Sequence, residues 1–390
     1  MKSILQYIKG DKVIWAVVML LSILSMLAVY SSISTLAYKS ASRNQEMILV
    51  KHFITVMLGL GLMYVVHLLK YTYYSRISQL VYWVSIPLLL LTLIMGTNLN
   101  DASRWLVVPG LGISFQTSDL AKLGLIMYVA RLLSKKQEQI KEFKATFVPI
   151  MLPVIIICGL ILPANFSTAA VLFATCLLLM FVGRINLKYL LAFIGTGIVL
   201  FAIFILIAIN LPEDAQKSLR IYTWKKRVEN FRDNDVKSSS NFQVNQAKIA
   251  IATGGISGKG PGKSTQRNFL PHPYSDFMYA FIIEEYGLVI GGVGVMFLYL
   301  LLLFRTIRIA TKTTSTFGAF LALGCCFLLI FQAMINMAVS VNLIPVTGQP
   351  LPFVSKGGTS VMFTGIAIGI ILSVSRGLEK ETEKVIDGHS

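Results

Sequence analysis

Long apolar segments recur from one end of this 390-residue sequence to the other, and they constrain its fold more than any other feature. The hydrocarbon core of a bilayer is about 30 Å thick, so a helix needs about 20 apolar residues to cross it. Several of the segments reach that length, and only 14% of all residues are charged, against about 25% in soluble domains. The apolar runs are continuous rather than alternating, which is not the pattern of a transmembrane barrel. The sequence therefore predicts an all-α polytopic membrane protein.

Ten segments are predicted as membrane spans, and together they predict a single integral membrane domain over residues 1–390. The first span follows Lys2, Lys9 and Lys12 like a signal anchor. It should be retained, because it is too long for a signal-peptide core and lacks a clear small-residue cleavage site. Only Ala164 and Asn165 separate the fifth and sixth spans, which predicts a tight hairpin. The predicted spans are 13–34, 53–69, 78–97, 119–134, 146–163, 166–183, 188–210, 277–304, 317–340 and 358–375.

Lysine and arginine in the short loops predict the orientation of the chain in the membrane. Such residues follow the second, fourth, sixth, eighth and tenth spans, on the same side as the N-terminus. Short cytoplasmic loops carry an excess of these residues, so both termini are predicted to be cytoplasmic. The net charge of +17 is explained in the same way and does not predict a nucleic-acid partner. A large loop over 211–275 and a Pro/Gly-rich loop over about 341–358 then lie outside.

The large loop is basic, with eleven Lys or Arg residues and five Asp or Glu residues. Long loops are largely exempt from the charge rule that sets orientation, so another reason is needed. Two interpretations stay open: ordinary solvated charge attracted to anionic lipid head groups, or a basic site for an anionic substrate. Apolar and basic residues are interleaved over 219–232, which predicts an amphipathic helix at the membrane interface.

Metal and thiol chemistry are not indicated by the cysteines and histidines. The four cysteines all lie in apolar runs, and no spacing with the four scattered histidines matches a metal motif. Cysteine in such surroundings behaves as a small apolar residue. The sequence therefore predicts buried cysteines and no metal centre.

Carboxylates on the eighth span point to a cavity. Asp276 stands at its start, and Glu284 and Glu285 lie two turns further, roughly 12 Å along the axis at 1.5 Å per residue. A carboxylate at the start of a helix can simply be stabilised there by the helix dipole. Ionisable residues at membrane depth, however, are costly and face the protein interior or a wet cavity. Three of them on one helix predict that this helix lines a cavity open to the outside.

Two further regions are predicted to face the same cavity. Asp119 and Lys122 lie three residues apart at the start of the fourth span, just after Arg104. They can form a local ion pair, or Lys122 can meet an anion in the cavity. The loop over 341–360 is dense in proline and glycine, and irregular backbone near a membrane is tolerated where it lines a cavity or is buried as a re-entrant turn.

These motifs, taken together, resemble those of the SEDS family (shape, elongation, division and sporulation proteins) over nearly the whole chain. Residues 102–122 are similar to its A-x-R-W…Q-P-S-E-x-x-K motif, and residues 345–360 to its specific P-V-T-G-x-P-L-P-F-x-S-Y-G-G-S-S motif. Residues 262–266 resemble the G-x-S-x-Q of the division branch, FtsW, more than the elongation branch, RodA. Further matches are residues 166–169 after the hairpin, and Gln243, Gln246 and 254–260 for the Q-x-x-Q…G-G-x-x-G-x-G run.

The sequence also departs from the family pattern. In the family's L-P-E-x-H-T-D-F motif, Asp276 is kept but the glutamate and the histidine are not. Asp119 stands where glutamate is usual, and Asn165 stands at or beside the usual hairpin aspartate. Lys356 replaces a tyrosine. Among these acidic motif positions, the catalytic hypothesis therefore rests mainly on Asp276.

The resemblance implies a peptidoglycan glycosyltransferase that polymerises lipid II, an undecaprenyl-pyrophosphate-linked disaccharide, during cell division. We hypothesise that Asp276 acts as the general base on the acceptor hydroxyl. A divalent cation, Mg²⁺ or Mn²⁺, is compatible with a pyrophosphate, although no dedicated ligand set is visible. The candidates for substrate binding are Arg104, Asp119, Lys122, Lys259, Lys263, Gln266, Arg267, Ser355 and Lys356, and those for support of the cavity are Asn165, Gln243, Gln246, Glu284 and Glu285.

The resemblance further implies a class B penicillin-binding (FtsI-like) transpeptidase and other division proteins as partners, and the septal region of the bacterial cytoplasmic membrane as the location. Three alternatives stay open. A lipid II flippase would use deep carboxylates such as Glu284 and Glu285, although no inverted repeat is apparent. An elongation-type paralogue would catalyse the same reaction at another site in the cell. A scaffold that only recruits division proteins would tolerate substitution of Asp276.

Overall fold

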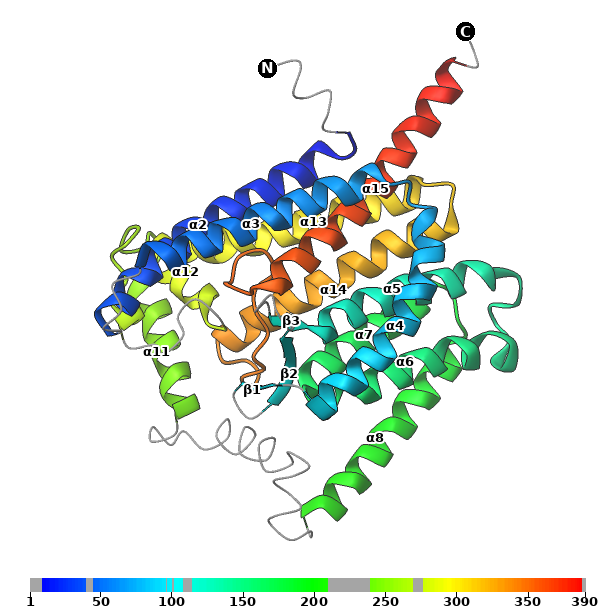
Figure 1. The fold of residues 1–390 in the computed structure, drawn as a ribbon, viewed down its shortest axis with the longest axis horizontal. Coiled ribbons are helices and arrows are strands. Elements are labelled where there is room, and N and C mark those ends of the chain that lie inside the picture. The colour runs from blue at the N-terminus through cyan, green and yellow to red at the C-terminus, as the bar shows by residue number, and fades with distance from the viewer. Residues whose placement is uncertain are drawn as a thin grey trace.

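The computed structural model describes residues 9–39, 45–95, 97–99, 102–107, 114–209, 239–268 and 276–387. Within these ranges the protein is a bundle of long helices with one small sheet (Figure 1). The helices are α2 (Lys12–Lys39), α3 (Gln45–Leu68), α4 (Tyr73–Met95), α5 (Thr117–Lys135), α6 (Val148–Ile161), α7 (Phe166–Val182), α8 (Leu187–Ile209), α11 (Ser239–Gly254), α12 (Met278–Gly287), α13 (Val295–Lys312), α14 (Thr316–Ser340) and α15 (Thr359–Asp387).

All ten predicted spans coincide with helices, so the predicted helical fold class is confirmed. Among the described residues, seven helical segments are long and apolar enough to cross a membrane by length and composition. The apolar helices Phe166–Val182 and Leu187–Leu200 are shorter. The seven segments are Lys12–Ser32, Leu49–Leu68, Tyr73–Met95, Phe143–Ile161, Met278–Lys312, Thr316–Ser340 and Thr359–Glu379.

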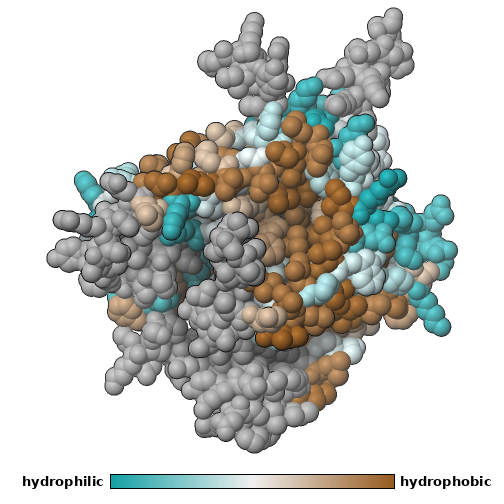
Figure 2. All heavy atoms as spheres, in the orientation of Figure 1, coloured by the Kyte–Doolittle hydropathy of each residue, from teal (hydrophilic) through white to brown (hydrophobic). Residues whose placement is uncertain are grey.

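Apolar side chains cover the outside of the bundle, as lipid contact requires. Figure 2 shows a broad hydrophobic band across the middle of the molecule, with hydrophilic residues gathered toward its ends. Large apolar side chains such as Leu20, Leu80 and Phe304 are more than half exposed. A soluble protein rarely exposes so large a contiguous apolar surface. The architecture is that of a multi-pass membrane protein.

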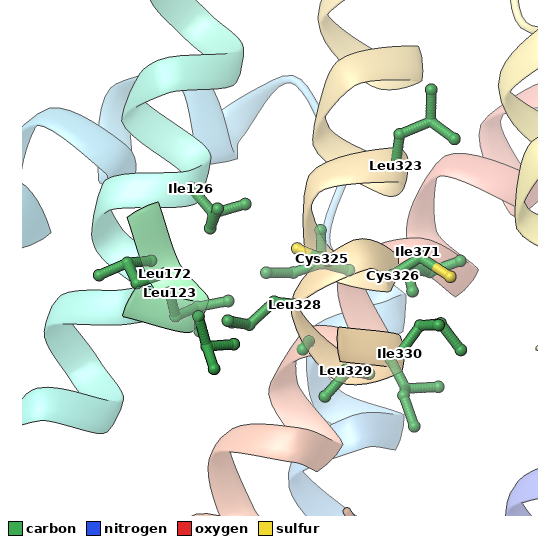
Figure 3. Packing of buried hydrophobic residues seen from close by; sticks show 14 of the residues in the cluster. Leu123, Ile126, Leu172, Leu323, Cys325, Cys326, Leu328, Leu329, Ile330 and Ile371 are labelled. Atoms are coloured by element: carbon green, nitrogen blue, oxygen red, sulfur yellow. The ribbon is translucent and has the colours of Figure 1, made fainter. Parts of the chain in front are cut away.

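The interior is also apolar, and α14 runs through it. Figure 3 shows side chains of α5, such as Ile126, and of α14, such as Leu328, within one packed cluster. Cys325 and Cys326 of α14 are fully buried there, and Cys158 and Cys176 are buried as well. All four cysteines are free thiols, which confirms the prediction that they are small core residues.

The eighth predicted span is less regular than one continuous α-helix. Its α-helices α12 and α13 are joined by a π-helical segment, Leu288–Gly294. Gly287 adopts a φ of +79°, and a Cβ atom there would lie 2.2 Å from the carbonyl oxygen of Ile256. The loop after α11 therefore packs directly on the end of α12, and only glycine fits at this contact.

A small sheet connects α4 to α5 and was not predicted. Its strands β1 (Thr97–Leu99), β2 (Ala102–Val107) and β3 (Ser114–Gln116) pair antiparallel in that order. Strands this short give little alternation to read from sequence. The sheet matters because β3 leads directly into the first turn of α5. One predicted feature, the amphipathic helix over 219–232, lies outside the described residues.

Helix α15 packs against α3 at backbone contact distance (Figure 1). A Cβ atom on Gly365 would lie 2.3 Å from the Gly59 carbonyl oxygen, and one on Gly369 would lie 2.6 Å from the Met63 carbonyl oxygen. Small residues four positions apart allow membrane helices to approach this closely. The contact fixes the start of α15, and the loop that precedes it, relative to α3.

We predict that Gly365→Ala lowers the melting temperature of the purified protein. The new methyl group would collide with backbone atoms that cannot move aside, and overpacking of this kind costs about 1–3 kcal/mol. Gly61→Ala on α3 is the matched control, because no atom of the described residues lies within 4 Å of the added methyl group. Equal melting temperatures for the two variants would contradict the packing argument.

Candidate active site

A cavity of about 290 Å³ lies where α5, α7, α12, α14, the 341–358 loop and the start of α15 meet. Five predicted site residues line it, although they come from four distant parts of the sequence. Most of the remaining lining is polar side chain or glycine. The predicted residues in the cavity wall are Asp119, Lys122, Asn165, Asp276 and Lys356.

Helix α5 supplies a buried ion pair to the cavity. Lys122 Nζ lies 2.7 Å from Asp119 Oδ1, and both side chains are less than 10% exposed. Asp119 lies in the first turn of α5, where the helix dipole stabilises its negative charge. Its Oδ2 atom is buried without a hydrogen-bond partner in the described part of the chain. The predicted ion pair therefore forms, and both of its residues also line the cavity.

Asp276 is held at the cavity by its backbone. The side-chain Nδ2 of Asn336 on α14 donates to the carbonyl oxygen of Asp276 (2.9 Å) and to that of Gln349 (2.8 Å). One amide group thus ties the start of α12 to the 341–358 loop. Gly348 adopts a φ of +71°, and a Cβ atom there would lie 3.8 Å from Asp276 Oδ2. The carboxylate therefore lies beside this loop at Gly348.

Asn165 joins the α6–α7 hairpin to the same loop. Its side-chain oxygen caps α7 by accepting from the backbone N–H of Thr168 (3.3 Å). The Thr168 hydroxyl in turn accepts from Gln349 Nε2 (2.7 Å). Asparagine is as good an N-cap as aspartate, so the loss of a charge at this position leaves the hairpin geometry intact.

Lys356 brings a second cation to the cavity wall. Its side chain is half-buried, and the preceding Ser355 is fully buried. Burial and, to a lesser extent, the positive charge of Lys51 lower the pKa of the Lys356 ammonium group. Burial disfavours the charged form, and a neighbouring like charge adds to that effect. Lys122 and Lys356 therefore place two ammonium groups around a space that also contains Asp276.

A second group of predicted residues gathers elsewhere, around Glu284 and Glu285 on α12. Glu284 Oε1 accepts from Lys259 Nζ (2.6 Å) and from the backbone N–H of Thr265 (3.0 Å). Glu285 Oε1 accepts from the backbone N–H of Gly262 (3.1 Å). These carboxylates are not among the residues that line the cavity. They bind the loop after α11 to α12.

The other predicted residues lie around this loop or outside the cavity lining. The Gln266 backbone N–H also donates to Glu284 (3.3 Å to Oε2), and Arg267 Nη1 donates to the carbonyl oxygen of Ser31 (3.1 Å). Lys263 is exposed, and Gln243 and Gln246 on α11 are half-exposed. Arg104 lies on β2, and its side chain is outside the described part of the structure.

Several lining residues were not predicted as site residues. Gln349 could have been found, because a polar side chain between Gly348 and Pro350 in a buried loop needs a partner. Gln332 is part of the wall and donates to the Pro350 carbonyl oxygen (3.2 Å). The remaining unpredicted polar side chains of the lining are Gln116, Thr168 and Ser360.

The residues of this site do not form a metal-ligand set. No group of three or more His, Cys, Asp and Glu side chains is placed to hold a metal ion within the described ranges. Asp119 and Asp276 supply two carboxylates to the cavity, but Lys122 already neutralises the first. The chemistry that the side chains themselves can provide is proton acceptance by a carboxylate and stabilisation of negative charge by ammonium groups.

Comparison with known proteins identifies the family. The family of cell cycle proteins that contains FtsW, RodA and SpoVE matches residues 11–380. The chain belongs to this family. A probable peptidoglycan glycosyltransferase FtsW from Trichlorobacter lovleyi is 32% identical over 95% of this chain and 94% of its own length. The Stage V sporulation protein E of Bacillus subtilis is 32% identical over 82% of this chain and 84% of its own length.

Solved structures of the FtsW/RodA/SpoVE family share the fold. A chain from a peptidoglycan synthase complex, solved in a study of the coordination of polymerization and crosslinking, is 25% identical with a TM-score of 0.71. It covers 94% of this chain and 98% of that one. RodA of Thermus thermophilus, 23% identical, superposes with a TM-score of 0.65 over 94% of this chain and 97% of its own. The resemblance drawn from the motifs is therefore confirmed.

We predict that Asn336→Leu destabilises the protein and disturbs the site. The change would leave the carbonyl oxygens of Asp276 and Gln349 without their donor, at a cost of about 1–3 kcal/mol for a buried group. Ser340→Ala is the control, because among the described residues that hydroxyl bonds only a carbonyl of its own helix (2.9 Å). Thermal unfolding in detergent should separate the two variants. If both melt at the same temperature, Asn336 does not hold these segments together.

Proposed function

We propose that this protein is a peptidoglycan glycosyltransferase that polymerises lipid II at the outer face of the bacterial cytoplasmic membrane. The observation that carries the proposal is that Asp276, Lys122 and Lys356 line the same cavity. A carboxylate and two ammonium groups are what the transfer of a sugar from a pyrophosphate needs. The names of the FtsW relatives support this reaction class.

In the proposed reaction, Asp276 accepts the proton of the acceptor sugar hydroxyl. The hydroxyl oxygen attacks the anomeric carbon of the donor, and the bond from that carbon to the pyrophosphate oxygen breaks. General-base assistance of this kind contributes about 10²–10⁴-fold. Negative charge grows on the pyrophosphate, which departs with its lipid chain.

Lys122 and Lys356 stabilise that growing charge in this proposal. Preorganised donors in a cavity shielded from water are worth more than the same donors in bulk solvent. Asp119 holds Lys122 in one conformation through the 2.7 Å ion pair, so little reorganisation is needed when the pyrophosphate binds. We also propose six further residues as substrate contacts: Arg104, Lys259, Lys263, Gln266, Arg267 and Ser355.

The proposed biological setting follows from the family. A role in division at the septum is supported by the relatives named FtsW. A class B penicillin-binding transpeptidase is the proposed partner, and the related peptidoglycan synthase complex supports a coupling of polymerization to crosslinking. We also propose a single membrane domain over residues 1–390 with both termini cytoplasmic. The hydrogen bond from Gly10 N to Glu379 Oε2 (2.8 Å) supports a common side for the two termini, because it joins the residues before α2 to the C-terminal part of α15.

A lipid II flippase is the second candidate function. A flippase would translocate lipid II without making a glycosidic bond. The contacts of Glu284 and Glu285 argue against a carboxylate path through the membrane, because these side chains bind the loop after α11. Glycan formation by the purified protein with its transpeptidase partner separates the two functions.

We predict that Asp276→Asn abolishes glycan synthesis from lipid II while the melting temperature stays unchanged. The amide keeps the shape of the carboxylate but cannot accept the proton. Glu138→Gln, which changes an exposed carboxylate after α5, is the control and should polymerise normally. Gel analysis of labelled glycan chains is the measurement. Normal chains from Asp276→Asn would refute the catalytic assignment.

We predict that deprotonation of Lys356 contributes to the fall of the polymerisation rate at alkaline pH. Its pKa is lowered, so the ammonium charge is lost at a lower pH than that of an ordinary lysine. Lys356→Arg should move the alkaline limb to higher pH, because arginine stays charged up to about pH 12. Lys51→Gln should move it in the same direction, because removal of the neighbouring charge raises the pKa of Lys356.

Initial rates of polymerisation across the alkaline range, measured at saturating lipid II, test this prediction. Lys70→Gln removes an exposed lysine beyond the end of α3 and should leave the profile unchanged. An alkaline limb that is identical in all four proteins would mean that Lys356 carries no charge of importance to the reaction.

A further inference from the structure

The turn that carries Lys356 into the cavity is buried and irregular. Residues 351–355 are all buried, with Val354 fully so. Phe353 adopts a φ of +63°, a left-handed conformation that is unfavourable for a bulky side chain. Such a conformation persists only where the surrounding structure over-determines it.

Helices that do not line the cavity hold this turn. The hydroxyl of Tyr299 on α13 donates to the carbonyl oxygen of Pro352. The hydroxyl of Ser25 on α2 donates to the carbonyl oxygen of Val354 (2.8 Å). The first carbonyl belongs to the peptide group directly before Phe353, and the second belongs to the peptide group between Val354 and Ser355, so these contacts hold the turn on both sides of the strained residue.

A histidine on a third helix completes the arrangement. His52 Nε2 on α3 lies 3.0 Å from Ser25 Oγ, and both residues are buried. The single hydroxyl proton of Ser25 is used on the Val354 carbonyl oxygen, which can only accept. Nε2 of His52 must therefore be the donor to Ser25 Oγ, and the chain of bonds has one direction: His52 to Ser25 to Val354.

We infer that Ser25 and His52 are positioning residues that fix the Phe353 turn and thereby present Lys356 to the cavity. Neither residue is among those that line the cavity, so their effect is exerted through the loop. The tight packing of α15 on α3 fixes the position of His52 relative to the end of the loop. The effect on catalysis rests on the proposed function, whereas the effect on the loop does not.

The conformation of the loop can be measured independently of enzymatic activity. We would place a cysteine at the end of the turn by Lys356→Cys and measure its labelling by a water-soluble maleimide. The four native cysteines are buried, so background labelling should be low. In this background, Ser25→Ala or His52→Leu should raise the labelling rate several-fold. Ser25→Thr and His52→Gln keep a hydrogen-bond donor, so the labelling rate should stay at that of the Lys356→Cys protein.

The matched control is Ser22→Ala on the same helix. The Ser22 hydroxyl is also buried, but within the described part of the chain it bonds only the Val18 carbonyl oxygen of its own helix (2.8 Å). Its loss should leave labelling unchanged. Equal labelling rates for the Ser25→Ala and Ser22→Ala proteins would overturn the inference, whether or not the protein proves to be a polymerase.

Activity gives the second readout, on proteins that keep the wild-type elution profile. Ser25→Ala should lower lipid II turnover about tenfold, the factor that corresponds to one buried hydrogen bond. The same change in a Lys356→Met background should have no further effect, because the group being positioned is already gone. A full tenfold loss in that background would show that Ser25 acts on something other than Lys356.

Discussion

The structure depends on how buried backbone polar groups are satisfied where the chain is not helical. In a membrane, an unpaired carbonyl or N–H costs several kcal/mol, so irregular backbone survives only where side chains pair with it. The 341–358 loop is the largest such segment in the described ranges that lines the cavity. Asn336 and Gln332 from α14 and Ser25 from α2 donate to its carbonyl groups.

These bonds explain why the cavity can be both polar and well defined. Each of them ties the loop to a helix that is anchored in the apolar core. Asn336 connects the loop to the backbone of Asp276 as well. Gln349, a side chain of the loop itself, extends the network to the α6–α7 hairpin through Thr168. Asp276 and Lys356 therefore project from backbone segments that side chains of neighbouring helices hold in place.

The sequence allowed much of this to be predicted. The apolar runs predicted all ten helical spans, because length and hydropathy follow from the thickness of a bilayer. Asp276, Lys122 and Asp119 could be proposed as cavity residues, because a charge in a membrane segment needs a polar environment. The small sheet before α5 and the π-helical segment after Gly287 were missed, because short strands and local helix geometry leave no periodic signal.

Glu284 and Glu285 illustrate the limit of such reasoning. The same cost argument applied to them as to Asp276, but it cannot tell which group neutralises a buried charge. The structure gives them partners in the loop after α11, including Lys259 and the backbone N–H of Gly262. Asp276, nine residues before Glu285, faces the cavity instead.

The sequence by itself determined that this chain crosses a membrane many times, which segments do so, and which few charged residues must be buried with them. Only the tertiary structure decided which of those residues meet. Asp276, Lys122 and Lys356 belong to segments far apart in the chain, and long-range hydrogen bonds hold the segments of Asp276 and Lys356 at the cavity. No local pattern encodes such bonds, because each one requires two distant segments to be packed before either partner is in reach.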